Sequence, residues 1–225
     1  MTLKVFYDLM SQPCRALIIF LKVNNISFES KVVALRKGEH LTEAFSKINP
    51  FRKVPVIDHN GFVLTESISM IRYLSREYKI LDNWYPKDSK RQAKVDEYLE
   101  WQHLNTRLFG SMIFRERVIT PLMTQKPINE EKIKFYKDGF QNVLKDIERG
   151  FLQNKNYLCG ETISVADIFC ACEIEQALAV GFDPFAEAPL VKAWLERIRQ
   201  ELDPHYSEVH GIVKKLASNI VSGKL

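Results

Sequence analysis

The segment that decides the fold spans residues 53–67 and reads KVPVIDHNGFVLTES. Two apolar runs, residues 54–58 and 62–65, flank the tripeptide His59-Asn60-Gly61. An Asn-Gly pair between two such runs is a strong signal of a β-hairpin, because both residues tolerate the positive φ that a tight hairpin turn needs. We therefore expect two antiparallel strands in this segment.

A helix is predicted directly after the hairpin, beginning near Glu66-Ser67. Its apolar residues recur with the spacing of one buried helix face, at Ile68, Ile71, Leu74 and Tyr78. Upstream, residues 3–7 and 28–34 predict two further strands, and a short helical patch is expected at residues 41–45. Pro13 opens another helix, which is apolar on nearly every side and therefore buried.

The resulting order, β-α-β-α-β-β-α, predicts a thioredoxin-like α/β domain over residues 1–80. It combines a parallel βαβ half, an antiparallel hairpin and a covering helix into a small mixed sheet with helices on both faces. The polar residues 79–87 break both periodicities and are interpreted as a linker.

Beyond the linker no strand pattern is found, and residues 88–225 are expected to form an all-helical domain. Proline and glycine residues separate its predicted helices, which cover residues 89–117, 129–151, 164–180, 188–201 and 205–215. Ser164 and Asp167 have the spacing of a capping box and mark the start of the third of these helices.

The composition is that of an ordinary soluble globular protein, with 46% hydrophobic and 27% charged residues. The net charge is +4, but the basic residues are scattered, so nucleic acid is not an expected partner. We expect a cytoplasmic protein without a membrane span, because no apolar run approaches bilayer length and the first residues lack signal-peptide features. The four cysteines do not form a disulfide framework, and Cys170-Ala171-Cys172 is interpreted as core rather than a metal site.

Five short motifs follow one another along the chain: Ser11-Gln12-Pro13-Cys14-Arg15, Asn49-Pro50, Lys53-Val54-Pro55, Leu64-Thr65-Glu66-Ser67 and Ser164-Val165-Ala166-Asp167. Their order and spacing, with a helical domain behind them, resemble those of cytosolic theta-class glutathione S-transferases over essentially the whole chain. The resemblance implies a homodimer that joins glutathione to small hydrophobic electrophiles, with a possible peroxidase activity. Glutathione would be a consumed cosubstrate, and neither a metal nor a bound prosthetic group is implied.

The resemblance also implies a set of glutathione-binding residues. Glutathione would pair its backbone with Val54, the residue before a cis proline, although the sequence alone favours a trans Pro55. Glu66 and Ser67 would hold the γ-glutamyl end, since a helix N-terminus attracts a carboxylate and Glu66 can accept from an ammonium; an ordinary N-cap is the alternative. Lys53 and His40 would contact the glycine carboxylate end, and are otherwise expected to be solvated surface residues.

Ser11 is the predicted catalytic residue, as a hydroxyl donor to the glutathione thiolate. One alternative comes from the residues themselves: Ser11 could cap the helix that Pro13 begins. A second comes with the resemblance, because other transferase classes use a tyrosine for this purpose and Tyr7 lies near the same strand end. A third concerns Cys14, which stands where a thioredoxin-like redox protein has a cysteine and could support a thiol transferase. A noncatalytic binding module with the same fold is a further alternative.

The electrophile pocket is expected between the loop before Ser11 and the long helix after the linker. Its predicted lining comprises Leu9, Met10, Arg107, Phe109, Met112 and Ile113. Arg107 matches an arginine that theta enzymes place near the leaving group, where a cation would stabilise a departing anion. A surface arginine paired with a glutamate is the alternative. Some theta enzymes fold a final helix over the site, but residues 218–225 are only a short tail here, so the resemblance does not extend to a closed lid.

Overall fold

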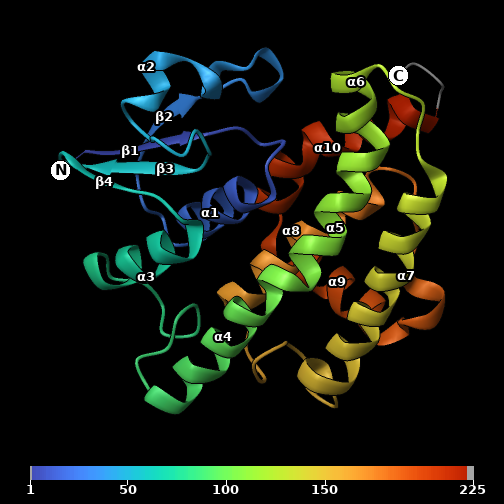
Figure 1. The fold of residues 1–225 in the computed structure, drawn as a ribbon. Helices are drawn as coiled ribbons and strands as arrows, with labels where there is room; N and C mark the ends of the chain where they lie inside the picture. The colour runs from blue at the N-terminus through green and yellow to red at the C-terminus, as the bar shows by residue number, and fades with distance from the viewer. Residues whose placement is uncertain (1, 222–225) are drawn as a thin grey trace.

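The computed structural model describes residues 2–221 and has a sheet domain followed by a helical domain (Figure 1). The elements of the sheet domain are β1 (Leu3–Tyr7), α1 (Gln12–Val23), β2 (Glu29–Val32), the 3₁₀ turns η1 (Leu35–Lys37) and η2 (Glu39–Leu41), α2 (Glu43–Ser46), β3 (Val56–His59), β4 (Phe62–Leu64) and α3 (Ser67–Glu77). The predicted thioredoxin-like fold class and element order are confirmed.

The sheet has the strand order β2-β1-β3-β4. β1 pairs with β2 in parallel, while β1–β3 and β3–β4 are antiparallel, as the predicted hairpin requires. Helices α1 and α3 lie on one side of the sheet and α2 lies on the other (Figure 1). The carboxyl end of β1 and the amino end of α1 therefore meet at the edge of the sheet domain that faces the helical domain.

The helical domain contains α4 (Ser89–Trp101), the 3₁₀ turn η3 (Gln102–Leu104), α5 (Thr106–Phe114), the π-helical turn η4 (Arg115–Ile119), α6 (Thr120–Thr124), α7 (Glu130–Asp146), the π-helical turn η5 (Ile147–Leu152), α8 (Val165–Leu178), the 3₁₀ turn η6 (Phe185–Glu187), α9 (Pro189–Leu202) and α10 (His205–Val221). The predicted helix over residues 89–117 is thus interrupted at η3. A further correction is α6, which was not predicted; Pro121 lies in its first turn, where a missing N–H is tolerated. The last helix extends to Val221, and residues 222–225 of the predicted tail lie outside the described residues.

Helix α8 forms the centre of the molecule. Every residue from Val165 to Ala177 is buried, and α8 packs against α1, α4, α5, α9 and α10. Its first turn confirms the predicted capping box: the Ser164 N–H donates to Asp167 Oδ2 at 2.9 Å. Cys170 and Cys172 are buried in this helix, as their core interpretation predicted, and all four cysteines are free.

The segment between the two domains is anchored to the start of α8. Trp84 is only 6% exposed, and its carbonyl accepts from the Val165 N–H at 3.0 Å. The Asn83 side chain donates to the Ile163 carbonyl at 2.9 Å. The linker therefore fixes the sheet domain to the same helix that α1 packs against.

Within residues 2–221, no helix is long and apolar enough to cross a membrane. No group of three or more His, Cys, Asp or Glu side chains suited to a metal ion is found in that part of the chain.

Candidate functional site

The loop that follows β1 is held in a defined turn by Asp8. This buried carboxylate accepts from the Met10 N–H at 2.8 Å and from the Leu35 N–H at 2.9 Å. The Asp8 carbonyl also accepts from the Ser11 N–H at 3.0 Å. Because both its side chain and its backbone bind the loop, Asp8 fixes the position of the Ser11 backbone.

Ser11 occupies the N-cap position of α1 with an extended backbone, and its side chain is half-buried. The predicted alternative, in which the Ser11 hydroxyl accepts a capping hydrogen bond from an N–H of α1, does not occur within the described residues. The hydroxyl therefore remains available at a helix N-terminus, where the unpaired N–H groups and the helix dipole favour negative charge.

The two alternative groups beside Ser11 are less suited to thiolate chemistry. Cys14 is 0% exposed, and burial raises the pKa of its thiol to about 12, although the nearby Ser11 side chain lowers that pKa in part. The Tyr7 hydroxyl shares a 2.9 Å hydrogen bond with Ser30 Oγ on β2. Cys14 is therefore an unreactive thiol of the α1 core, and the Tyr7 hydroxyl is bonded within the sheet.

The Val54–Pro55 peptide bond directly before β3 is cis, in agreement with the resemblance and against the trans form that the sequence alone favoured. Val54 is half-buried, and no backbone group among the described residues bonds to its N–H or C=O. The preceding turn is fixed by the buried Asn49, whose side chain donates to the Lys53 carbonyl at 2.7 Å. Val54 thus offers a free backbone donor and acceptor at the end of a strand, the arrangement that binds an extended peptide.

Glu66 lies at the N-cap position of α3 in an unusual backbone conformation, with φ 64° and ψ 107°. A residue other than glycine at positive φ costs about 1–3 kcal/mol, and such residues cluster at functional sites. The side chain is exposed and does not cap α3, and Ser67 is the first residue of the helix. An ordinary N-cap would not need this conformation, so the geometry favours the binding interpretation of Glu66.

His40 and Lys53 are placed differently from each other. His40 is in η2, and its Nδ1 is buried without a hydrogen-bond partner among the described residues. Such an unpaired buried nitrogen is costly unless a ligand or water satisfies it. The Lys53 side chain is exposed.

Arg107 forms an ion pair with Glu173 of α8, with 3.1 Å between Nη1 and Oε1. The predicted alternative of pairing with a glutamate therefore applies, but the pair is not on the surface, because the Glu173 side chain is 1% exposed and that of Arg107 is 38% exposed. Burial raises the pKa of Glu173, while the Arg107 charge opposes that shift. Glu173 Oε2 is buried without a partner among the described residues.

The predicted electrophile residues do not share one surface. Leu9 and Met10 are half-buried on the loop before Ser11, but Ile113 is fully buried in the core. The Phe109 ring packs closely over Gly139 of α7, where even a Cβ atom would lie 2.1 Å from it.

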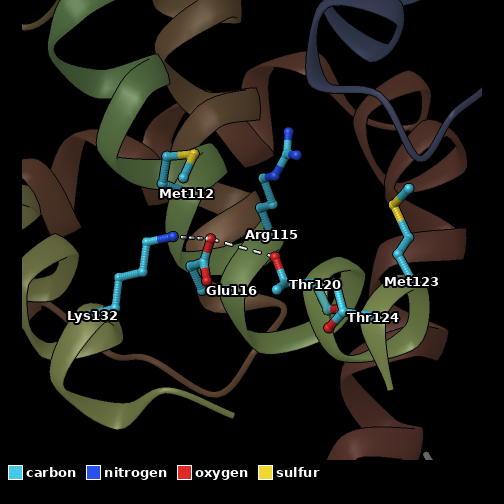
Figure 2. Close-up of a pocket in the computed structure, with 7 residues that line it drawn as sticks. All are labelled: Met112, Arg115, Glu116, Thr120, Met123, Thr124 and Lys132. Carbon is cyan, nitrogen blue, oxygen red and sulfur yellow. Dashed lines mark hydrogen bonds and ion pairs between the residues drawn. The ribbon is translucent and has the colours of Figure 1, made fainter. Parts of the chain in front are cut away.

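Met112 lines a cavity of about 400 Å³ between η4, α6 and α7 that includes none of the other predicted electrophile residues. Its full lining comprises Met112, Arg115, Glu116, Thr120, Met123, Thr124 and Lys132. Figure 2 shows Glu116 paired with Lys132, at 2.9 Å, and bonded to Thr120, while Arg115 extends away from this group. Met112 thus lines a cavity that Leu9 and Met10 do not share, and Ile113 lies in the core.

Comparisons with known proteins agree with the fold. The sequence model of the glutathione S-transferase N-terminal domain matches residues 11–77, and that of the C-terminal domain matches residues 112–201. Glutathione S-transferase theta-1 of Bos taurus is 38% identical over 216 residues, which cover 96% of this chain and 90% of the relative. The chain belongs to the theta class of glutathione S-transferases.

Two solved structures of the class show the same fold. Human glutathione S-transferase T1-1 in its apo form superposes with a TM-score of 0.91 at 36% identity, covering 96% of this chain and 91% of that chain. A human theta-class transferase in complex with the glutathione conjugate of 1-menaphthyl sulfate superposes with a TM-score of 0.93 at 33% identity, covering 100% of this chain and 92% of that chain.

Three residues that contact the predicted site residues were missed by sequence reasoning: Asp8, Arg15 and Glu173. A signal existed for Arg15, because a charged residue within the otherwise apolar start of α1 must be buried with partners. Asp8 also had one, since an aspartate directly after a strand commonly bonds the backbone two residues on. Glu173 had no local signal, because its partner Arg107 lies 66 positions away.

Proposed function

We propose that this chain transfers the glutathione thiolate to small hydrophobic electrophiles, with the Ser11 hydroxyl stabilising the thiolate. The observation that carries the proposal is the Ser11 side chain, which stands at the start of α1 without capping it while Asp8 fixes its backbone. The hydroxyl of a serine at an N-cap usually accepts a hydrogen bond from an N–H in the first turn of the helix. One that does not is available to a ligand.

The energy required is within reach of these groups. A thiol has a pKa of about 8.5, and lowering it by about two units takes roughly 2.7 kcal/mol. A hydrogen bond to a charged group contributes roughly 1.5–3 kcal/mol, and a helix N-terminus roughly 0.3–1 kcal/mol. One hydroxyl and the adjacent end of α1 are therefore sufficient.

Glutathione would be held by hydrogen-bonding and charged groups that are available to a ligand in the structure. The backbone of Val54 would pair with the peptide, while Glu66 and Ser67 would hold the γ-glutamyl end at the start of α3. His40, whose Nδ1 is buried and unpaired among the described residues, and the exposed Lys53 would receive the glycine carboxylate. This arrangement would bring the sulfur to the loop that carries Ser11.

The electrophile would bind against Leu9 and Met10, with Arg107 near its leaving group. The buried Glu173 restrains the Arg107 guanidinium without removing it from solvent, so that the cation stays available to a departing anion. Fixing sulfur and electrophile side by side then supplies the proximity on which the transfer depends. Phe109 and Ile113 are left out of this proposal because their side chains face α7 and the core.

The test is an ultraviolet titration of glutathione bound to the protein. We expect a thiolate band well below pH 7.5, and Ser11→Ala should raise the pKa of the bound thiol by about 1–2 units, because one hydrogen bond to the thiolate is lost. Ser164→Ala, which alters the serine at the start of α8, is the matched control and should leave that pKa unchanged. An unchanged thiol pKa in Ser11→Ala would refute the role of Ser11.

The alternative of a noncatalytic module predicts a different result. Such a module would bind glutathione tightly yet give no product with any member of a panel of alkyl halides, aryl halides, sulfate esters and organic hydroperoxides. Conjugation of at least one carbon electrophile would exclude it. Turnover of the hydroperoxide would establish the predicted peroxidase activity.

We also infer a homodimer. It is supported by large apolar side chains that are exposed on the edge strand β4 and on helices of the other domain, namely Phe62, Val63, Leu104, Leu108 and Phe135. Light scattering should give twice the 26.2 kDa chain mass, and Phe62→Lys should lower it where Leu190→Lys, on exposed α9 surface, does not. The cytoplasmic location and the absence of nucleic-acid partners stay predictions.

A further inference from the structure

Arg15 is a fully buried arginine, with 0% of its surface exposed. It lies in the first turns of α1, where all residues from Pro13 to Leu21 are buried. Burying a guanidinium is expensive unless its donors are satisfied, and a buried ion pair usually accomplishes that. None of the hydrogen bonds that Arg15 makes within the described residues goes to a carboxylate.

The two ends of the Arg15 fork point to different domains. Nη1 donates to the carbonyl oxygens of Leu9 at 2.7 Å and of Met10 at 3.2 Å. Nη2 donates to the Cys172 carbonyl at 3.2 Å and to Gln176 Oε1 at 2.7 Å, both on α8. The guanidinium therefore bridges the loop before Ser11 and the central helix of the other domain.

Asp8 and Arg15 hold the loop through opposite kinds of backbone group. Asp8 binds its N–H groups, at Met10 and Ser11, whereas Arg15 binds its C=O groups, at Leu9 and Met10. These contacts hold the two peptide units that directly precede Ser11. The partner on the α8 side is rigid, because α8 is buried from Val165 to Ala177 and begins with a complete capping box.

We propose that Arg15 is a positioning residue for thiolate stabilisation: its fork ties the Leu9-Met10 backbone to α8 and thereby sets where the Ser11 hydroxyl stands. The effect needs the planar fork, not the charge alone, because only a guanidinium presents two paired donors to both sides at once. An ammonium at this position reaches one side. A displacement of about 1 Å at a reacting group lowers rates by up to about 100-fold.

The experiment compares Arg15→Lys, which keeps the charge, with Arg15→Met, which removes it. In both variants we expect the pKa of bound glutathione to rise by about one unit or more, and kcat/KM at pH 6.5 to fall about 10-fold or more while recovering as the pH rises. Arg199→Lys is the matched control: Arg199 also ties a helix to α8, through Glu175 at 2.8 Å, but does not touch the loop. It should leave the thiol pKa unchanged.

Gln176→Leu covers the case in which the Arg15 variants do not fold. It removes one of the four acceptors and leaves the charge in place, so the thiol pKa should rise in the same direction by a smaller amount. An unchanged thiol pKa in Gln176→Leu, or in folded Arg15→Lys, would overturn the proposal. The proposal would also be overturned if the thiol pKa were unchanged in Arg15→Lys but raised in Arg15→Met, because the positive charge alone would then account for the effect.

The proposal rests on the role assigned to Ser11, and the same titration separates the two. If Ser11→Ala leaves the thiol pKa unchanged, the proposed function of Ser11 is wrong. If Ser11→Ala raises it and neither Arg15→Lys nor Gln176→Leu does, Ser11 keeps its role and only the positioning role of Arg15 is rejected.

Discussion

The molecule has two serines at helix starts that use their hydroxyl groups in opposite ways. Ser164, at the start of α8, is buried and bound to Asp167 through both its N–H, at 2.9 Å, and its hydroxyl, at 3.0 Å. Ser11, at the start of α1, is half-buried and its side chain caps nothing. Both positions satisfy the same local sequence rule, yet only one of them uses the hydroxyl for stability.

The difference lies in what fixes the backbone. At α8 the carboxylate of Asp167 sits three residues inside the helix and holds the start of that helix together. At α1 that task is done from outside, by Asp8 on one side of the loop and by Arg15 on the other. Because other groups fix the loop, the Ser11 hydroxyl is not needed as a cap and is available to a ligand. A residue at an N-cap position can in this way serve in binding or catalysis.

The strongest way to test the structural half of this comparison is Asp167→Ala. Asp167 accepts from the Leu158 and Ser164 N–H groups and from Trp194 Nε1, all at 2.9 Å. Removing it leaves these buried donors unpaired, so the free energy of unfolding should fall by about 3–5 kcal/mol in urea denaturation. Asp88→Ala, at the exposed cap of α4, is the control and should cost only about 1 kcal/mol. A cost near that of the control would show that the Asp167 network contributes little.

The comparison itself is tested by measuring the free energy of unfolding of both Ser11→Ala and Ser164→Ala. Ser164→Ala should lower the free energy of unfolding by about 0.5–2 kcal/mol, because a cap is lost. Ser11→Ala should change it by less than about 0.5 kcal/mol, since no capping bond exists there, although the same variant should raise the pKa of bound glutathione. Equal stability losses in both variants would mean that Ser11 is a second structural cap.

Much of the fold could be predicted because its signals are local. The Asn-Gly hairpin, the period of α3 and the capping box of α8 each lie within one short segment, and each has the predicted place in the structure. The break in the helix predicted for residues 89–117 could not be predicted in this way. Apolar residues continue through η3 with a helical spacing, so the pattern carries no sign of the interruption.

The positions of candidate site residues could be predicted only where a local sequence pattern marks them. Glu66 and Ser67 follow a strand and begin a helix, and the structure places them there. Arg15 finds its partners 157 and 161 positions along the chain, so no local pattern could name them. Ile113 is buried in the core for another reason: α5 presents apolar residues to the core as well as toward solvent, and spacing alone cannot separate the two sides.

A pH-dependent effect concerns His210 on α10, which packs against both α1 and α8. Burial lowers the pKa of His210 to about 3, and the charges of Arg15, Lys214 and Arg199 lower it further, while the Tyr206 carbonyl opposes them. Because the unfolded chain takes up this proton near pH 6.5 and the folded chain does not, stability that is complete above that pH is lost as the pH falls toward 3.

The expected loss is roughly 1 kcal/mol for each pH unit across this window. Urea denaturation at several pH values should show a shallower slope in His210→Gln than in the unmodified chain, whereas His103→Gln, at an exposed position, should leave the slope unchanged. Identical slopes in His210→Gln and the unmodified chain would contradict the assignment of a neutral buried imidazole.

The smallest effect should come from Cys14→Ala, and its smallness is informative. The Cys14 thiol lies three residues after Ser11 and is 0% exposed, with a pKa of about 12, so it is neither ionised nor reachable by a disulfide. We expect kcat for conjugation to change less than about twofold, while the loss of a buried sulfur lowers the free energy of unfolding by about 1 kcal/mol. Abolished turnover would instead support the thiol transferase and assign the chemistry of this helix start to its cysteine. If Cys14→Ala retains turnover and Ser11→Ala raises the pKa of the bound thiol, the chemistry at the start of α1 belongs to the Ser11 side chain, which does not cap the helix.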